Sequence, residues 1–375
     1  MFFDNASTTK IDKDILKYFD SINDDFYYNP GALYYTGRNV RKRIDTYREK
    51  ILKNLNGTGK IVFTGSATEA NNLALLGVVK RNFRKILVSM GEHPSVYNTA
   101  LELIQRGYNV EFVPLNKYGV VDIKVFEKYM TPDVDFISIM HVSNETGAVN
   151  DIANLVYVAK SINPNVIFHS DGVQAVGKIN VDIDDIDVDM YTMSAHKIHG
   201  MKGVGALFVK NNIKLKPIIF GGGQESGLRS GTENILGIFS LNVAVENSIK
   251  NLDNNYSFVK LLKDKFLSEL QRSNLIYSLN SFEGNSPYII SISFDGCRSE
   301  TLLNMLNDKG VFVGNGSACS SKNSGNRILD SMGVSKTDIE GNLRISFSKY
   351  NTLEEVYTMS KILIETVDEY LHKVR

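Results

Sequence analysis

The chain has 375 residues, of which 43% are hydrophobic and 22% are charged. This composition is typical of a globular protein with a sizeable core, and the length allows two domains. Forty-two basic residues balance forty-two acidic residues, so we expect no direct partner among nucleic acids or acidic membrane surfaces, which usually bind a basic excess. The sequence has no signal-peptide pattern, no run of roughly 20 apolar residues that could span a bilayer, and too few cysteines for a disulfide framework. A cytoplasmic protein is therefore expected.

Short β-rich runs alternate with longer amphipathic stretches from about residue 60 onward. Apolar strands separated by helical stretches indicate βαβ units and a mainly parallel sheet, which binds ligands at the carboxyl ends of its strands. The candidate strands are Ile61–Thr64, Lys85–Met90, Asn109–Leu115, Val134–Met140, Val166–Asp171, Asp189–Ser194 and Val204–Lys210. The candidate helices between them are Thr68–Arg81, Ser95–Arg106, Ile123–Met130 and Ile152–Ile162.

The pattern changes after the glycine run Gly221–Gly223 and predicts a smaller α+β domain. Two long helices would act as the hinge into it. The expected elements are helices at Ile235–Lys250, Ser257–Gln271, Glu300–Asp308 and from about Leu353 to the end, with strands at Tyr288–Phe294 and Leu343–Phe347.

A loop of small residues, Thr64–Glu69, follows the first strand and opens a helix. The first N–H groups of a helix lack internal partners and lie at the positive end of its dipole, so this loop could cradle a phosphate. Taken alone, the segment is better explained as a turn with a Ser or Thr N-cap.

Two later strands end in polar residues that could do chemistry. Asp171 could hold a ring nitrogen protonated and Gln174 could reach a ring substituent, although Asp171 could equally cap the next turn. Lys197 follows the next strand beside Ser194 and His196. A lysine in this position is better placed than most to be desolvated and to form an imine.

The remaining candidates are one histidine pair and the two cysteines. His196 and His199 form an H-x-x-H pair, but no third ligand stands nearby, so we expect no metal site. Cys319 lies in a run of small and polar residues, which predicts an exposed or mobile thiol. Cys297 stands at a strand-end turn and is interpreted as structural.

In this order, the motifs resemble the cysteine desulfurases of the NifS/IscS kind, within the class V aminotransferase branch of the fold-type I pyridoxal phosphate enzymes. The resemblance implies a large α/β cofactor-binding domain with a mainly parallel sheet over residues 15–250. Residues 1–14 and 251–375 would form a smaller α+β domain that carries the Cys319 loop. The strongest matches are Ala67–Asn72, Glu92–Pro94, Asn144–Gly147, Ser194–Lys197, Gly221–Glu225, Arg229–Asn234 and Gly316–Cys319.

The resemblance also implies roles for individual residues. Lys197 would hold pyridoxal 5'-phosphate and move protons at the substrate α-carbon, while the Cys319 thiolate would take sulfur from L-cysteine as a persulfide and leave L-alanine. His93 would stack on the cofactor ring and act as an acid/base near the substrate thiol. Asp171 would pair with the ring nitrogen, and Arg344 would clamp the substrate carboxylate. The further cofactor contacts would be Ala67, Thr68, Asn144, Gln174, Ser194, His196 and Thr232, with Asn144 also touching the substrate.

Partners follow from the same resemblance. Thr232 would reach the phosphate in the neighbouring subunit, which implies an obligate homodimer. The persulfide would pass to a sulfur-acceptor protein for iron–sulfur cluster assembly or tRNA thiolation. Tyr34 departs from the His of many relatives and could alter the mouth of the site.

Three other functions stay open at this point. A selenocysteine lyase would use the same residues, because its substrate differs by one atom. Another class V aminotransferase-like enzyme would have no use for a mobile thiol at Cys319. A catalytically silent scaffold would not need Lys197, Asp171, His93 and Arg344 together.

Overall fold

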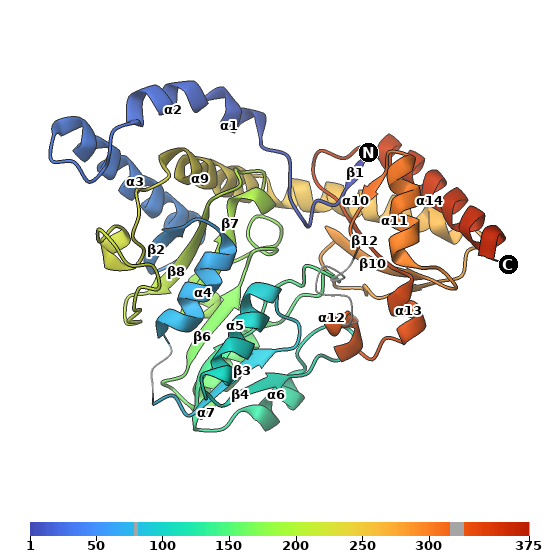
Figure 1. The fold of residues 1–375 in the computed structure, drawn as a ribbon, viewed down its shortest axis with the longest axis horizontal. Helices are drawn as coiled ribbons and strands as arrows, with labels where there is room; N and C mark the ends of the chain where they lie inside the picture. The colour runs from blue at the N-terminus through green and yellow to red at the C-terminus, as the bar shows by residue number, and fades with distance from the viewer. Residues whose placement is uncertain (79–81, 316–325, 375) are drawn as a thin grey trace.

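A seven-stranded sheet lies at the centre of the larger part of the molecule (Figure 1). The computed structural model describes residues 1–78, 82–315 and 326–374. Strand β8 pairs antiparallel with both of its neighbours, and the other pairings between adjacent strands are parallel, so the expected mainly parallel sheet is confirmed. In spatial order the strands are β2 (Gly59–Thr64), β8 (Gly205–Lys210), β7 (Met190–Ser194), β6 (Ile167–Asp171), β5 (Val134–Ser138), β3 (Lys85–Ser89) and β4 (Val110–Val113).

Both faces of this sheet are buried. Successive side chains of a strand point to opposite faces, so Val62 of β2 belongs to the core cluster that includes side chains of α4 and α5, while Ile61 and Phe63 belong to the cluster that includes side chains of α3, α7 and α9. Burial on both faces explains why the strands appear in the sequence as continuous apolar runs. The helices concerned are α3 (Tyr35–Asn54), α4 (Ala67–Val78), α5 (Pro94–Gln105), α7 (Ile152–Ile162) and α9 (Ile235–Lys250).

A second, smaller unit has its own hydrophobic core, which includes Phe266, Ile290 and Leu343. Its central strand β10 pairs antiparallel with β9 and β12, and β1 pairs parallel with β11. Figure 1 shows α11 and α14 beside these strands, with α10 extending from the larger unit. The elements are β1 (Phe2–Phe3), β9 (Tyr277–Leu279), β10 (Ile289–Phe294), β11 (Phe312–Val313), β12 (Asn342–Ser346), α10 (Leu252–Gln271), α11 (Ser299–Asp308) and α14 (Leu353–Val374).

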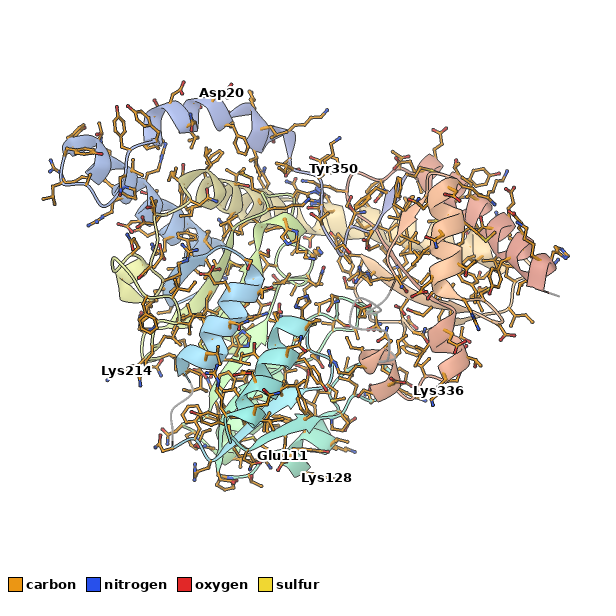
Figure 2. All side chains as sticks on the ribbon, in the orientation of Figure 1. Asp20, Glu111, Lys128, Lys214, Lys336 and Tyr350 are labelled. Atoms are coloured by element: carbon orange, nitrogen blue, oxygen red, sulfur yellow. The ribbon has the colours of Figure 1, made fainter. Side chains whose placement is uncertain are left out.

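The N-terminal segment joins the two units. Phe3 lies in the core of the smaller unit, whereas the chain a few residues later runs along the larger one. At the junction, the Asp12 carboxylate accepts hydrogen bonds from Lys349 Nζ at 2.9 Å and from the Tyr350 hydroxyl. Figure 2 labels Tyr350 at this boundary, where its ring meets the His199 ring edge-on at 5.0 Å between centroids.

Several elements differ from the sequence expectation. The helices before residue 60 were not predicted: α1 and α2 are too short to show a clear apolar period, and the longer α3 was also missed. Ile328 and Leu329 of α12 pack into the core of the larger unit, although they lie far along the chain. No helix in the described ranges is long and apolar enough to cross a membrane. The remaining helices are α1 (Lys13–Lys17), α2 (Phe19–Phe26), α6 (Ile123–Tyr129), α8 (Ile183–Ile186), α12 (Arg327–Ser331) and α13 (Lys336–Glu340).

The smaller core gives a first prediction, on stability. Ile290 is fully buried in β10, so Ile290→Ala removes apolar contacts and leaves a cavity; we expect it to lower the free energy of unfolding by about 2–5 kcal/mol. Ile276 is 72% exposed, so Ile276→Ala should change stability by less than about 0.5 kcal/mol. Urea unfolding followed by circular dichroism measures both. Equal effects of the two substitutions would contradict the packing described for the smaller unit.

Candidate active site

Several of the predicted site residues lie at the carboxyl edge of the large sheet. Asp171 is the last residue of β6 and Ser194 the last of β7, and these strands are adjacent and parallel. A 3₁₀ turn at Ala195–Lys197 follows β7 directly. The carboxyl ends of parallel strands therefore bring Asp171 and Lys197 to one edge of the sheet, where open α/β sheets bind ligands.

The Lys197 amine is held by the N-terminal segment. Its Nζ donates hydrogen bonds to the carbonyl oxygens of Ala6 at 2.6 Å and Ser7 at 2.7 Å. Burial, together with the nearby Arg344 charge, lowers the pKa of Lys197 to about 8. A lysine with this pKa is partly neutral near pH 8, and the neutral amine is the form that attacks a carbonyl carbon.

Gln174 and a second lysine extend this cluster. Gln174 Nε2 donates to the Ala6 oxygen at 2.9 Å, and the buried Lys178 donates its Nζ hydrogen to Gln174 Oε1. Because a carbonyl oxygen can only accept, the contact with Ala6 fixes which end of the Gln174 amide is the nitrogen, and its oxygen faces Lys178. Burial and the charge of Lys197 lower the pKa of Lys178 to about 7.

The Asp171 carboxylate is buried and hydrogen-bonded. Its Oδ2 accepts from Asn71 Nδ2 at 2.8 Å, and its Oδ1 accepts from the Val173 N–H at 3.0 Å. The following residue has to be glycine, since a Cβ at Gly172 would stand 2.0 Å from the ring of the fully buried Tyr191. The tight packing behind Asp171 holds its carboxylate in one position.

His93 begins α5 as its N-cap. The ring Nδ1 accepts a hydrogen bond from the Ser95 N–H at 3.1 Å and lies 2.8 Å from Ser95 Oγ. Pro94 occupies the first helical position, where its missing N–H costs nothing. Burial lowers the pKa of His93, against the opposing charge of Asp171.

Arg344, on β12, is surrounded by acceptors. Its guanidinium donates to Asp4 Oδ1 at 2.9 Å and Ser7 Oγ at 2.7 Å on one nitrogen. The other nitrogen donates to the Asn144 carbonyl oxygen at 3.0 Å and to Glu145 Oε1 at 3.4 Å. Burial raises the pKa of Glu145, although the Arg344 charge opposes the shift. Arg344 thus joins the smaller unit to the N-terminal segment and to the loop after β5.

The turn before α4 is held in place by Glu69. Its carboxylate accepts from the Gly65 N–H at 2.8 Å and from Arg229 Nε at 2.7 Å. Ser66 Oγ accepts from the Glu69 N–H at 3.1 Å, so the turn is capped as expected. Thr68 is exposed in the first turn of α4, and Ala67 is its first residue. The other N–H groups of this turn lie at the positive end of the helix.

The structure places some predicted residues close to Lys197 and leaves others apart. His196 Nδ1 lies 3.2 Å from Thr8 Oγ1, and burial lowers its pKa to about 4. Thr232 is exposed in the loop before α9 and is not among the described residues that contact Lys197 through a hydrogen bond. Cys319 lies outside the described residues. In the described part of the chain, no group of three His, Cys, Asp or Glu side chains could hold a metal ion.

Five residues at the site were not expected to be there from the sequence. Each is an ordinary polar residue in a helix, a loop or the N-terminal segment; Asn71 and Glu145 lie in stretches that match the family, but the sequence assigned neither of them a role at the site. Their partners are far away along the chain, so only the fold brings them together. They are Asp4, Asn71, Ser95, Glu145 and Lys178.

Comparison with known proteins agrees with the geometry. The aminotransferase class-V family model matches residues 1–359, so the chain belongs to this family. It is 35% identical over 367 residues to cysteine desulfurase IscS 1 of Archaeoglobus fulgidus, covering 96% of this chain and 95% of that protein. These findings confirm the resemblance and the fold expected from the sequence.

Solved structures give the same fold. A NifS-like protein superposes with a TM-score of 0.92 at 33% identity, covering 98% of this chain and 99% of that one. SspA in complex with cysteine superposes with a TM-score of 0.82 at 29% identity, covering 94% of this chain and 99% of that one.

The lowered pKa of Lys197 leads to a second prediction. Hydroxylamine treatment and dialysis first free the Lys197 amine of any carbonyl compound bound to it as an imine. Acylation of Lys197 by trace acetic anhydride should then reach half its maximal rate near pH 8, because only the neutral amine reacts. An ordinary lysine reaches that point at about pH 10.4. Peptide mass spectrometry across a pH series measures the rate. A midpoint above pH 10 would contradict a buried, desolvated Lys197.

Proposed function

We propose that this protein is a pyridoxal 5'-phosphate-dependent cysteine desulfurase that converts L-cysteine to L-alanine and leaves the sulfur on Cys319 as a persulfide. The observation that carries the proposal is the Lys197 amine, desolvated at the carboxyl edge of the sheet with Asp171 and Arg344 nearby. The names of the relatives and the cysteine complex of SspA support the same substrate.

The residues at this edge of the sheet fit the cofactor. Among the described residues, Ser194 Oγ and Asn144 Oδ1 are buried polar atoms without a hydrogen-bond partner, which is costly unless a ligand supplies one. The exposed start of α4 suits a phosphate group. Lys197 would hold the cofactor aldehyde, and Asp171 would face its ring nitrogen. Phosphate contacts would come from Ala67, Thr68, Ser194 and His196, and ring contacts from His93, Asn144 and Gln174.

The bound cofactor would supply an electron sink for negative charge at the substrate α-carbon. Arg344 would bind the substrate α-carboxylate with its planar guanidinium, helped by the Asn144 side chain. Lys197 would remove and return the proton at the α-carbon, a task that suits an amine with a pKa of about 8. Its Nζ lies within hydrogen-bond distance of the Ala6 and Ser7 carbonyl oxygens, which can orient the amine.

The sulfur step balances without a further reactant. The Cys319 thiolate attacks the substrate sulfur, a sulfur–sulfur bond forms, and the carbon–sulfur bond of L-cysteine breaks. The substrate β-carbon takes a proton, so one thiol and L-cysteine give one persulfide and L-alanine. Low-pKa, accessible cysteines are the ones that react in this way.

Two partners belong to this proposal. A second copy of the chain would place its exposed Thr232 at the phosphate site, making a homodimer. A cytoplasmic sulfur-acceptor protein would take the persulfide sulfur and serve iron–sulfur cluster assembly or tRNA thiolation.

A third prediction tests the persulfide. Incubating the wild type with L-cysteine should add one sulfur atom to the intact mass, mapped to Cys319, and should release alanine; with a thiol reductant it should also release sulfide. Cys319→Ser should release neither alanine nor sulfide, because the nucleophile is gone. It should still bind the cofactor, because the residues around Lys197 are unchanged. Cys297→Ser, which alters the cysteine buried in the smaller core, serves as the matched control and should keep activity. Equal desulfuration by Cys319→Ser and wild type would refute the mechanism.

A fourth prediction concerns the second subunit. Thr232→Ala should weaken cofactor binding about tenfold or more, because one hydrogen bond to a charged group is lost. Mixed dimers of Thr232→Ala and Lys197→Ala should recover one site of wild-type affinity, since the intact Lys197 then meets the partner's intact Thr232. Thr337→Ala, at an exposed position in α13, is the control and should bind the cofactor as the wild type does. Mixed dimers that recover no such site would exclude a contact across the interface.

A further inference from the structure

A chain of hydrogen bonds links His93 to Asp171 through two buried residues. Asn71 Nδ2 lies 2.8 Å from Asp171 Oδ2 and 2.8 Å from Ser95 Oγ. Ser95 Oγ lies 2.8 Å from His93 Nδ1. Asn71 is completely buried and Ser95 is 8% exposed, so water does not compete for these contacts.

The direction of each bond in this chain is fixed by chemistry. An ionised carboxylate only accepts, so the amide nitrogen of Asn71, and not its oxygen, must face Asp171. The second hydrogen of that nitrogen points to Ser95 Oγ, which therefore accepts. The single hydroxyl hydrogen of Ser95 is left for His93 Nδ1, its remaining neighbour in the chain.

The backbone imposes the same direction on His93. The Ser95 N–H, at the start of α5, also donates to Nδ1 at 3.1 Å. A hydrogen on Nδ1 would face both this N–H and the positive end of the helix dipole. The N–H and the hydroxyl of Ser95 thus both face Nδ1 as donors, which makes Nδ1 an acceptor and leaves the ring proton on Nε2.

We propose that Ser95 and Asn71 are positioning residues that hold the His93 imidazole neutral, with its proton on Nε2, by connecting it to Asp171. His93 then offers an N–H donor from the side of the ring opposite Ser95. The part that concerns catalysis rests on the proposed function. There, His93 would stabilise negative charge developing on cofactor or substrate, and would not remove the proton of the substrate thiol through Nε2.

The charged groups around His93 act in the same direction, with one exception. Lys197 on the 3₁₀ turn, Arg327 on α12 and Arg344 on β12 all disfavour a positive imidazole, as does burial, whereas Asp171 on β6 favours one. The net effect is a lowered pKa for His93. Asn71 donates a hydrogen bond to Asp171, whose negative charge opposes this effect. That hydrogen bond weakens the attraction of the Asp171 carboxylate for a protonated His93 ring.

Hydrogen–deuterium exchange at the histidine C2 position, read by mass spectrometry over a pH series, gives the protonation constant of His93 in the purified protein. Ser95→Ala removes one donor to Nδ1 and breaks the link to Asp171. We expect it to raise the protonation constant of His93 about threefold to tenfold, the size of one neutral hydrogen bond. Asn71→Leu should shift it in the same direction. The matched control is Thr99→Val, which alters a buried hydroxyl one turn further along α5 that bonds to the Ser95 carbonyl; it should leave the constant unchanged.

The tautomer is measured separately. In wild-type protein labelled with ¹⁵N at histidine and assigned with His93→Gln, the chemical shifts should show a protonated Nε2 and a bare Nδ1. A protonated Nδ1, or a Ser95→Ala protonation constant equal to that of Thr99→Val, would overturn the proposal. Neither readout depends on turnover of L-cysteine. Failure of the desulfurase function would instead appear as absence of the Cys319 persulfide in the wild type, with the His93 results unaffected.

Discussion

The hydrogen bonds from Lys197 Nζ to the carbonyl oxygens of Ala6 and Ser7 connect the two units of the structure. Ala6 lies in the core of the smaller unit, yet its oxygen contacts a turn that follows strand β7 of the larger sheet. The same oxygen accepts from Gln174. A buried amine is costly unless it is paired, so the path of the N-terminal segment and the position of Lys197 determine each other.

Arg344 also connects the two units, in this case from the smaller unit. It stands on a strand of the smaller unit, but its guanidinium bonds to the N-terminal segment and to the loop after β5. Breaking such a network at one member leaves the others buried and unpaired, which costs more than the network contributes. The two units are thus joined by charged hydrogen bonds that lie at the site itself, and any change in their relative position would change the distance between Lys197 and Arg344.

Much of this could be predicted from the sequence, where the signal is local. Asp171 and Lys197 were predicted as site residues because they follow apolar strands, and both the strand and its end can be recognised in a short stretch of sequence. The antiparallel direction of β8 was not predicted, since an apolar run carries no information about direction. Asn71 and Ser95 were missed for a different reason. Each is an unremarkable residue of a helix, and its role depends on a partner from another element, at a distance that only the folded chain sets.

Desolvation also explains the charge state of the site as a whole. It lowers the pKa of Lys178 to about 7 and of Lys197 to about 8, and it raises the pKa of the fully buried Glu92 to about 8. The cluster is therefore closer to neutral at physiological pH than its residue types suggest. Binding a phosphate or carboxylate there would favour the protonated lysines, and by linkage protonated lysines would bind the anion more tightly. Burial keeps the Lys197 amine available for carbonyl chemistry while leaving a site that gains positive charge when an anionic ligand enters.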